Sequence, residues 1–140
     1  MDTRFSVALH ILSMVSESKE NLSSQALAKS VGGNPSYIRK VIVLLKNAQL
    51  IDSSQGRSGY KLLKEPKNIT LLEIYYATQE IDKIRIFELH KNSNKECPVG
   101  KNIEKAMTPI FMHVEQTMQE ELSHRTLQNV IDNLYQIANK

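Results

Sequence analysis

Apolar residues recur at helical spacing in three segments near the start of the chain, covering about residues 3–16, 24–31 and 35–47. Ser23 or Ser24 is placed to cap the second segment. Gly32 and Gly33 separate the second and third segments, and Pro35 suits the first turn of a new helix. The pattern therefore predicts two helices joined by a tight glycine turn. The residues predicted to face the core are Leu27, Ala28, Val31, Ile38, Val41, Ile42 and Leu45.

The pattern then changes from helix to hairpin and back to helix. Two short β-capable runs, residues 50–54 and 60–63, flank a glycine-rich segment over residues 55–59. Thr70 and Glu73 form a capping box that predicts a helix over about residues 70–80. Residues 81–96 have no clear period, and further helices are predicted over about residues 98–122 and 127–138. We expect the last helix to turn five apolar residues inward: Leu127, Val130, Ile131, Leu134 and Ile137.

Helix, short helix, glycine turn, helix and hairpin is the element order of a winged helix-turn-helix. We therefore predict a mostly α-helical chain with a small β-hairpin and a long C-terminal dimerisation helix. Residues 1–66 are predicted to form the winged helix-turn-helix DNA-binding domain. Residues 67–140 are predicted to form a helical region for dimerisation and sensing.

Charge is distributed unevenly between these two regions. The formal net charge of the chain is +3, but residues 1–64 carry nine Lys or Arg and four Asp or Glu, a net +5. Residues 65–140 carry a net −2, and residues 28–64 alone carry +6. A basic module joined to an acidic one is typical of a protein that binds a polyanion and has a separate second function. A chance partition of surface charge is the alternative explanation.

The basic segment also places its charges where this fold meets DNA. The second helix of the motif enters the major groove with its N-terminal side chains at the base edges. An arginine at a wing tip reaches a minor groove or a phosphate, and Lys61 and Lys64 add nonspecific phosphate contacts. Tyr37 either touches backbone sugars or packs locally. The predicted DNA-contacting residues are Ser24, Gln25, Pro35, Ser36, Tyr37, Arg39, Lys40, Arg57, Ser58 and Lys61.

Several stretches resemble the Rrf-type winged helix-turn-helix regulators of bacteria. The matching stretches are residues 5–12, residues 23–45, Leu50-Ile51 through Gly56-Arg57-Ser58-Gly59-Tyr60, residues 69–74, and Cys97-Pro98-Val99 with the helix behind it. This family contains the iron–sulfur cluster assembly regulator, the nitric-oxide-sensitive repressor and the cysteine-metabolism repressor. The resemblance covers nearly the whole chain and implies a dimeric transcription regulator, most similar to the branch without a cluster.

A dimer is also expected from the residues themselves. Apolar residues of the long helix recur at spacings of three and four, and a helix of this length spans about 35 Å at 1.5 Å per residue. Such a stripe favours a partner helix, unless the first and last helices cover it within one chain. The predicted dimer interface is formed by Ile103, Met107, Ile110, Phe111, Val114, Met118 and Leu122.

Cys97 is the one residue with candidate redox chemistry. It precedes Pro98 at the predicted start of the long helix, where the helix dipole favours a thiolate. Lys95 and Lys101 add to this effect, and Glu96 opposes it. An accessible thiolate is open to oxidation, which makes Cys97 the candidate redox sensor. The alternatives are a cysteine packed as a small apolar residue, and a regulator that responds to a small-molecule ligand.

Other chemistry is not expected. An iron–sulfur cluster normally requires several thiolates, and the chain has one cysteine. The four histidines show no metal-binding spacing, and no phosphate loop, dinucleotide motif or catalytic set is present, so we predict no cofactor, no metal and no enzyme activity. The chain has no apolar run of membrane-spanning length and no secretory signal, so we expect a cytoplasmic protein without a membrane partner. The competing hypothesis for its function is a winged-helix adaptor that docks proteins.

Overall fold

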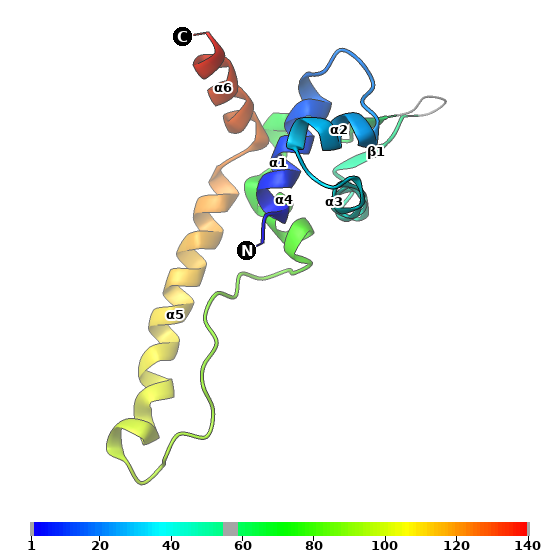
Figure 1. Cartoon of the computed structure of the whole chain (residues 1–140). Helices are drawn as coiled ribbons and strands as arrows, with labels where there is room; N and C mark the ends of the chain where they lie inside the picture. Colours follow the sequence, from blue (N-terminus) through cyan, green and yellow to red (C-terminus); the bar gives the residue numbers. More distant parts are fainter. Residues whose placement is uncertain (1, 55–58, 140) are drawn as a thin grey trace.

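The computed structural model describes residues 2–54 and 59–139. It is mostly helical, with one two-stranded antiparallel hairpin, so the predicted fold class is confirmed (Figure 1). The elements are α1 (Arg4–Glu17), α2 (Ser24–Val31), α3 (Pro35–Asn47), β1 (Ile51–Ser53), β2 (Tyr60–Leu62), a 3-10 turn (Pro66–Asn68), α4 (Leu71–Gln79), α5 (Pro98–His124) and α6 (Leu127–Ala138).

Side-chain caps fix where these helices begin. The Ser23 side chain accepts a hydrogen bond from the Ala26 N–H at the start of α2. Thr70 and Glu73 form the predicted capping box at α4, with each side chain bonded to the other residue's backbone N–H. A cap of this kind satisfies N–H groups that have no partner inside the helix and stabilises it by about 1 kcal/mol.

One hydrophobic core joins the N-terminal and C-terminal parts of the chain. Ile69 and Ile74 lie fully buried beside the apolar faces of α1, α2 and α3, and Leu127 and Ile131 of α6 join the same cluster. The backbone ties the two parts as well, because the Leu127 N–H donates to the Ile69 carbonyl at 2.9 Å. Packing therefore crosses the domain boundary predicted between residues 66 and 67. The division of the chain into a DNA-binding domain and a region for dimerisation and sensing stays a prediction.

The helix α5 forms a stalk that leaves this core (Figure 1). No residue of α5 is buried, although the helix has 27 residues. The segment 80–97 runs along the stalk as irregular chain toward its far end, and the Phe87 ring lies against the Phe111 ring with centroids 4.6 Å apart. The Phe87 N–H also donates to the Glu115 carboxylate at 3.3 Å. None of the helices described is long and apolar enough to cross a membrane.

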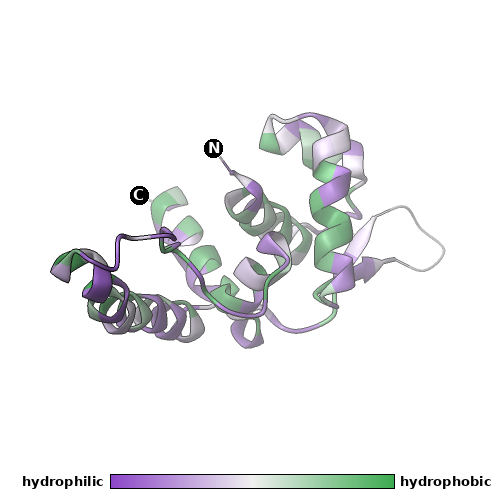
Figure 2. Cartoon of the chain, turned by 90° about the horizontal axis from the view of Figure 1, so that it is seen from below, coloured by the Kyte–Doolittle hydropathy of each residue, from purple (hydrophilic) through white to green (hydrophobic). Residues whose placement is uncertain are grey.

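The prediction that all five apolar residues of α6 face inward is wrong beyond the second turn of the helix. Leu127 and Ile131 are buried, but Leu134 is 50% exposed and Ile137 is 68% exposed. Green, apolar residues continue along α6 toward the C-terminus in Figure 2. Helical period identified the apolar face correctly, but α1 of the same chain covers only the first part of that face.

Candidate nucleic-acid interface

A tight turn sets the angle between α2 and α3. Gly32 ends α2 in the left-handed region, with φ of 79°, where a residue without a side chain is favoured. Asn34 then caps α3, because its side-chain oxygen accepts the Ser36 N–H at 2.8 Å, and Pro35 occupies the first helical position. This turn places the first turns of α3 at the surface.

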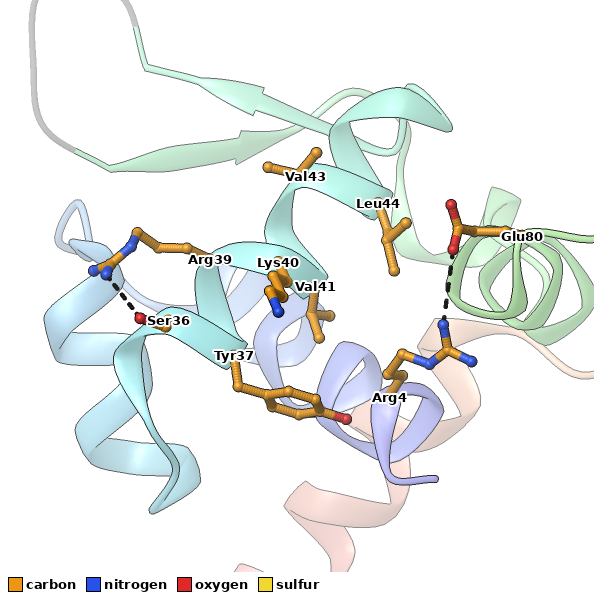
Figure 3. A pocket seen from close by; sticks show the side chains of 9 residues that line it. All are labelled: Arg4, Ser36, Tyr37, Arg39, Lys40, Val41, Val43, Leu44 and Glu80. Carbon is orange, nitrogen blue, oxygen red and sulfur yellow. Dashed lines mark hydrogen bonds and ion pairs between the residues drawn. The ribbon is translucent and has the colours of Figure 1, made fainter. Parts of the chain in front are cut away.

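The exposed face of α3 is basic. Ile38, Ile42 and Leu45 anchor the helix in the core, while Arg39 and Lys40 are exposed. The Arg39 guanidinium makes a 3.3 Å hydrogen bond to the Ser36 hydroxyl one turn earlier (Figure 3). Neither Arg39 nor Lys40 forms an ion pair with an acid in residues 2–54 or 59–139. Their charges therefore remain available to a phosphate or a base edge.

Tyr37 packs locally, which is one of the two alternatives that its sequence position left open. Its side chain is half-buried against the core, and its hydroxyl lies 3.1 Å from the Thr3 hydroxyl. In Figure 3 it points toward α1, whereas Arg39 points toward α2. The residue therefore links α3 to the start of α1.

Arg4 and Glu80 also border α3, although neither was among the predicted site residues. They line a cleft of about 550 Å³ together with Tyr37 and Lys40 (Figure 3). Arg4 is held by Asp2 at 2.8 Å and lies 3.9 Å from Glu80. The hydrogen bond from Arg4 lowers the pKa of Asp2 far below its ordinary value. The only sequence signal for this cluster was the close spacing of Asp2 and Arg4 before a helix.

Gly59 lies directly before strand β2, where the hairpin approaches the loop between α1 and α2. Its φ is 118°, and a Cβ at this position would lie 2.8 Å from the Asn21 Cβ and 3.1 Å from the Leu22 nitrogen. Glycine is therefore required where the hairpin passes the loop between α1 and α2. Arg57 and Ser58, the predicted wing contacts, lie outside the described residues.

The remaining predicted contacts lie on the surface around α3. Gln25 is exposed and Ser24 is half-buried at the start of α2, before the first helical hydrogen bond from Leu27 to Ser23. Lys61 is exposed on β2, directly across the hairpin from Asp52. Pro35 and Ser36 are exposed at the start of α3.

The Lys64 side chain forms an ion pair within the chain, in contrast to that of Lys61. Its ammonium group bonds to the Glu73 carboxylate at the start of α4. Partial burial raises the pKa of Glu73, but hydrogen bonds from Lys64 and the Thr70 N–H outweigh it and lower the pKa overall. Lys64 therefore holds α4 against the hairpin instead of standing free for phosphate.

The predicted dimer stripe on α5 is divided between two environments. Five of its residues are half-buried toward their own chain: Ile103, Met107, Phe111, Met118 and Leu122. Ile110 is 63% exposed and Val114 is 43% exposed. Together with Val99, which is 66% exposed, they form an apolar face that the chain does not cover.

Cys97 lies at the far end of the stalk from α3 (Figure 1). It is exposed and caps α5, with its sulfur accepting the Gly100 N–H at 3.5 Å. The loop before it passes close to the helix, since a Cβ on Gly100 would clash with the Asn94 carbonyl oxygen. The thiol is therefore accessible, but it is remote from the basic face of its own chain.

The capped turn, the basic face of α3 and the adjacent hairpin together define a winged helix-turn-helix module of the DNA-binding type. The model of the Rrf2 family, described as an iron-dependent transcriptional regulator, matches residues 1–133. The chain therefore belongs to the Rrf2 family of transcriptional regulators, which confirms the resemblance seen in the sequence.

Individual relatives agree with this assignment. A Bacillus subtilis (strain 168) protein named HTH-type transcriptional regulator YwnA is 40% identical over 135 residues, covering 96% of this chain and 99% of its own length. A crystal structure described as that of a DNA binding protein shares 40% identity with a TM-score of 0.74, over 91% of this chain and 98% of its own. The B. subtilis global cysteine regulator CymR, at 20% identity, shares the fold with a TM-score of 0.71 over 94% of this chain and 95% of its own.

The family description names iron, so the donor residues must be compared with what iron requires. Iron–sulfur clusters are held by several cysteine thiolates, and this sequence contains only Cys97. In the part of the chain that the structure describes, no three His, Cys, Asp or Glu side chains gather as a metal site. The residues present do not fit an iron centre.

Proposed function

We propose that this chain is a homodimeric transcription repressor that binds a roughly two-fold symmetric operator. The observation that carries the proposal is the exposed Arg39 and Lys40 pair, which lies without acidic partners among the described residues, on a helix whose start is fixed by a cap and a glycine turn. Two copies related by a two-fold axis present two such helices to half-sites one or more helical turns apart, about 34 Å per turn.

Repression is proposed because the family that the sequence resembles includes repressors. A bound dimer blocks a promoter by occupying it. Selection of genomic fragments with the purified protein tests the first part of the proposal, and we expect recovered sites with inverted half-sites. A reporter placed behind such a site is expected to fall in expression when the protein is present. No enrichment of any duplex and no salt-dependent affinity would favour the protein-docking adaptor instead.

We further propose that oxidation of Cys97 tunes DNA affinity and that the regulator works without a cofactor. Support comes from the exposure of the thiol at the start of α5. Peroxide oxidises the thiol to sulfenic acid: the O–O bond breaks, sulfur loses two electrons, and water leaves. A second thiol required for a disulfide must come from another molecule, because the chain has one cysteine.

The oxidation proposal is tested by comparing wild type and Cys97→Ser. Both proteins are treated with hydrogen peroxide, and duplex affinity is measured by fluorescence anisotropy before and after treatment. We expect the affinity of wild type to change while that of Cys97→Ser stays constant. An equal change in both proteins would contradict a role for Cys97.

A further inference from the structure

An aliphatic side chain lies in the middle of the basic face of α3. Val43 is 52% exposed. At about 100° per residue around the helix axis, Val43 lies about 40° from Arg39 and about 60° from Lys40, in opposite directions. It is therefore flanked by the two basic side chains, and Ser36 lies about 20° away on the same face.

Neither the core nor the helix itself accounts for a valine at this position. The residues that anchor α3 in the core lie on the opposite side of the helix and are at most 2% exposed: Ile38, Val41, Ile42 and Leu45. In Figure 3 the Val43 side chain points away from α1 and from Tyr37. Valine is also a weaker helix former than Ala, Lys or Gln, because its branched Cβ restricts χ1. Val43 is thus presented to the outside of the module.

Exposure alone would not distinguish Val43, because isolated aliphatic side chains are common on protein surfaces. Its neighbours distinguish it. The acids within the described ranges leave Arg39 and Lys40 without an ion pair, so the surface around Val43 attracts a polyanion. A ligand that fits this surface combines negative charge at its edges with an apolar group at its centre.

Duplex DNA has both features in its major groove. The groove is about 12 Å wide and admits an α-helix between two rows of phosphates. Valine has no hydrogen-bonding group in its side chain, so it cannot read the donors and acceptors on the base edges. The one apolar group among these edges is the C5-methyl group of thymine. Because valine has one strongly preferred χ1 in a helix, contact with this methyl group costs little conformational entropy.

The neighbouring arginine gives the position of that thymine. The Arg39 guanidinium is held by the Ser36 hydroxyl at 3.3 Å, and its fork of N–H donors matches the O6 and N7 acceptors of guanine. Arg39 and Val43 are four residues apart, which is about 6 Å along the helix axis. Base pairs are stacked about 3.4 Å apart, so the two side chains reach base pairs about two steps apart.

We propose that Val43 reads the C5-methyl group of a thymine in the major groove, about two base pairs from a guanine that Arg39 contacts. The assignment rests on the proposed DNA binding and deepens it, because it names a base in each half-site of the operator. Phosphate contacts position the helix but carry no sequence information. Val43 therefore supplies discrimination that the charges of Arg39 and Lys40 do not.

Deoxyuridine tests this contact one methyl group at a time. It pairs with adenine as thymine does and lacks only the C5-methyl group. Each thymine of a duplex recovered by genomic selection is replaced in turn by deoxyuridine, and the affinity is measured by fluorescence anisotropy at a fixed salt concentration. At the thymine that Val43 contacts, we expect wild type to bind about fourfold more weakly for one substituted half-site and about fifteenfold for both.

Val43→Ala removes the protein side of the same contact. Alanine is a strong helix former at an exposed position, and circular dichroism checks that the variant is folded. We expect Val43→Ala to bind the thymine duplex more weakly than wild type does and to respond to deoxyuridine at that position by less than about twofold. Ile86→Ala is the matched control, because Ile86 is an aliphatic residue outside the module with 45% exposure. It should keep the full wild-type response.

A second selection gives a readout that a merely structural role would not move. With Val43→Ala, we expect the enrichment of thymine at this position to fall, while the guanine about two base pairs away stays enriched. Unchanged enrichment of that thymine would overturn the assignment.

Failure of this assignment is distinguishable from failure of DNA binding. A deoxyuridine effect of equal size in wild type and Val43→Ala, no effect at any thymine, or half-sites without a thymine about two base pairs from an enriched guanine would each overturn the role of Val43 and leave the proposed DNA binding standing. If wild type shows no salt-dependent affinity for any duplex, the proposed function fails together with the assignment.

Discussion

The Tyr37 hydroxyl lies 3.1 Å from the Thr3 hydroxyl and so connects α3 with the residue that precedes α1. The two residues are 34 positions apart in the sequence. The aromatic ring of Tyr37 packs against the core, while its hydroxyl reaches the surface. The helix that carries Arg39 and Lys40 is thus held in two ways. Its start is fixed by the Asn34 cap, and the Tyr37 contact ties it to the start of α1.

Removing this hydroxyl is expected to have a small and specific effect. Tyr37→Phe keeps the packed ring and removes one exposed hydrogen bond, so the free energy of unfolding should fall by about 0.5 kcal/mol. Thr3→Val should cost a similar amount. Both variants remove the same hydrogen bond. The double variant should therefore lose less unfolding free energy than the two single variants together, as measured by urea denaturation. Fully additive effects would contradict the link.

The position of the wing depends on Gly59. Gly59→Ala places a Cβ 2.8 Å from Asn21 and forces a side chain onto a φ of 118°. We expect a decrease of about 1–3 kcal/mol in unfolding free energy, together with weaker DNA binding. Gly33→Ala is the matched control, since its Cβ would meet Ile38 at an ordinary 3.7 Å. Equal stability of the two variants would show that the backbone at Gly59 does not pass close to the loop between α1 and α2.

The ion pair of Lys64 with Glu73 makes stability depend on pH. The pKa of Glu73 is lowered in the folded state from its ordinary value of 4.5. The ionised carboxylate therefore stabilises the fold fully above pH 4.5, and this stabilisation is lost as the pH falls through the pKa of the folded state. Glu73→Gln should therefore flatten the decline of unfolding free energy below about pH 4.5. The cost at neutral pH should be about 0.5 kcal/mol, because the pair is exposed. A decline as steep as in wild type would contradict the assignment.

The stacking of Phe87 on Phe111 is expected to order the segment that leads to Cys97. Phe87→Ala should increase amide hydrogen exchange in residues 86–97, because the segment then has no aromatic ring packed on α5 at this point. Ile86→Ala is the control, since Ile86 has a similar exposure, 45% against 41%, but no aromatic ring to stack. Unchanged exchange in Phe87→Ala would show that other interactions hold the segment.

Local signals were sufficient to predict most of the fold. Thr70 and Glu73 marked the start of α4, and the period of Ile38, Val41 and Leu45 placed the buried face of α3. These features depend on residues three or four positions apart, which is the range that a sequence pattern describes well. The exposed basic face of α3 followed from the same period.

Long-range features could not be read in the same way. The irregular path of residues 81–97 depends on Phe87 meeting Phe111, a contact between segments without a shared pattern. The apolar residues Leu134 and Ile137 were recognised as one face, but a helical period does not identify the chain that covers it. Arg4 was missed as a neighbour of α3 because only folding brings the start of α1 beside that helix.

We expect the exposed face of α3 to bind duplex DNA. The most direct measurement is the salt dependence of duplex affinity for wild type, an Arg39→Ala and Lys40→Ala double variant, and Lys83→Ala, which removes an exposed lysine outside the module. We expect the double variant to bind at least about tenfold more weakly, with a salt slope smaller by about one unit for each phosphate that it no longer neutralises. Lys83→Ala should bind like wild type. Equal affinity and equal slope for wild type and the double variant would contradict the account.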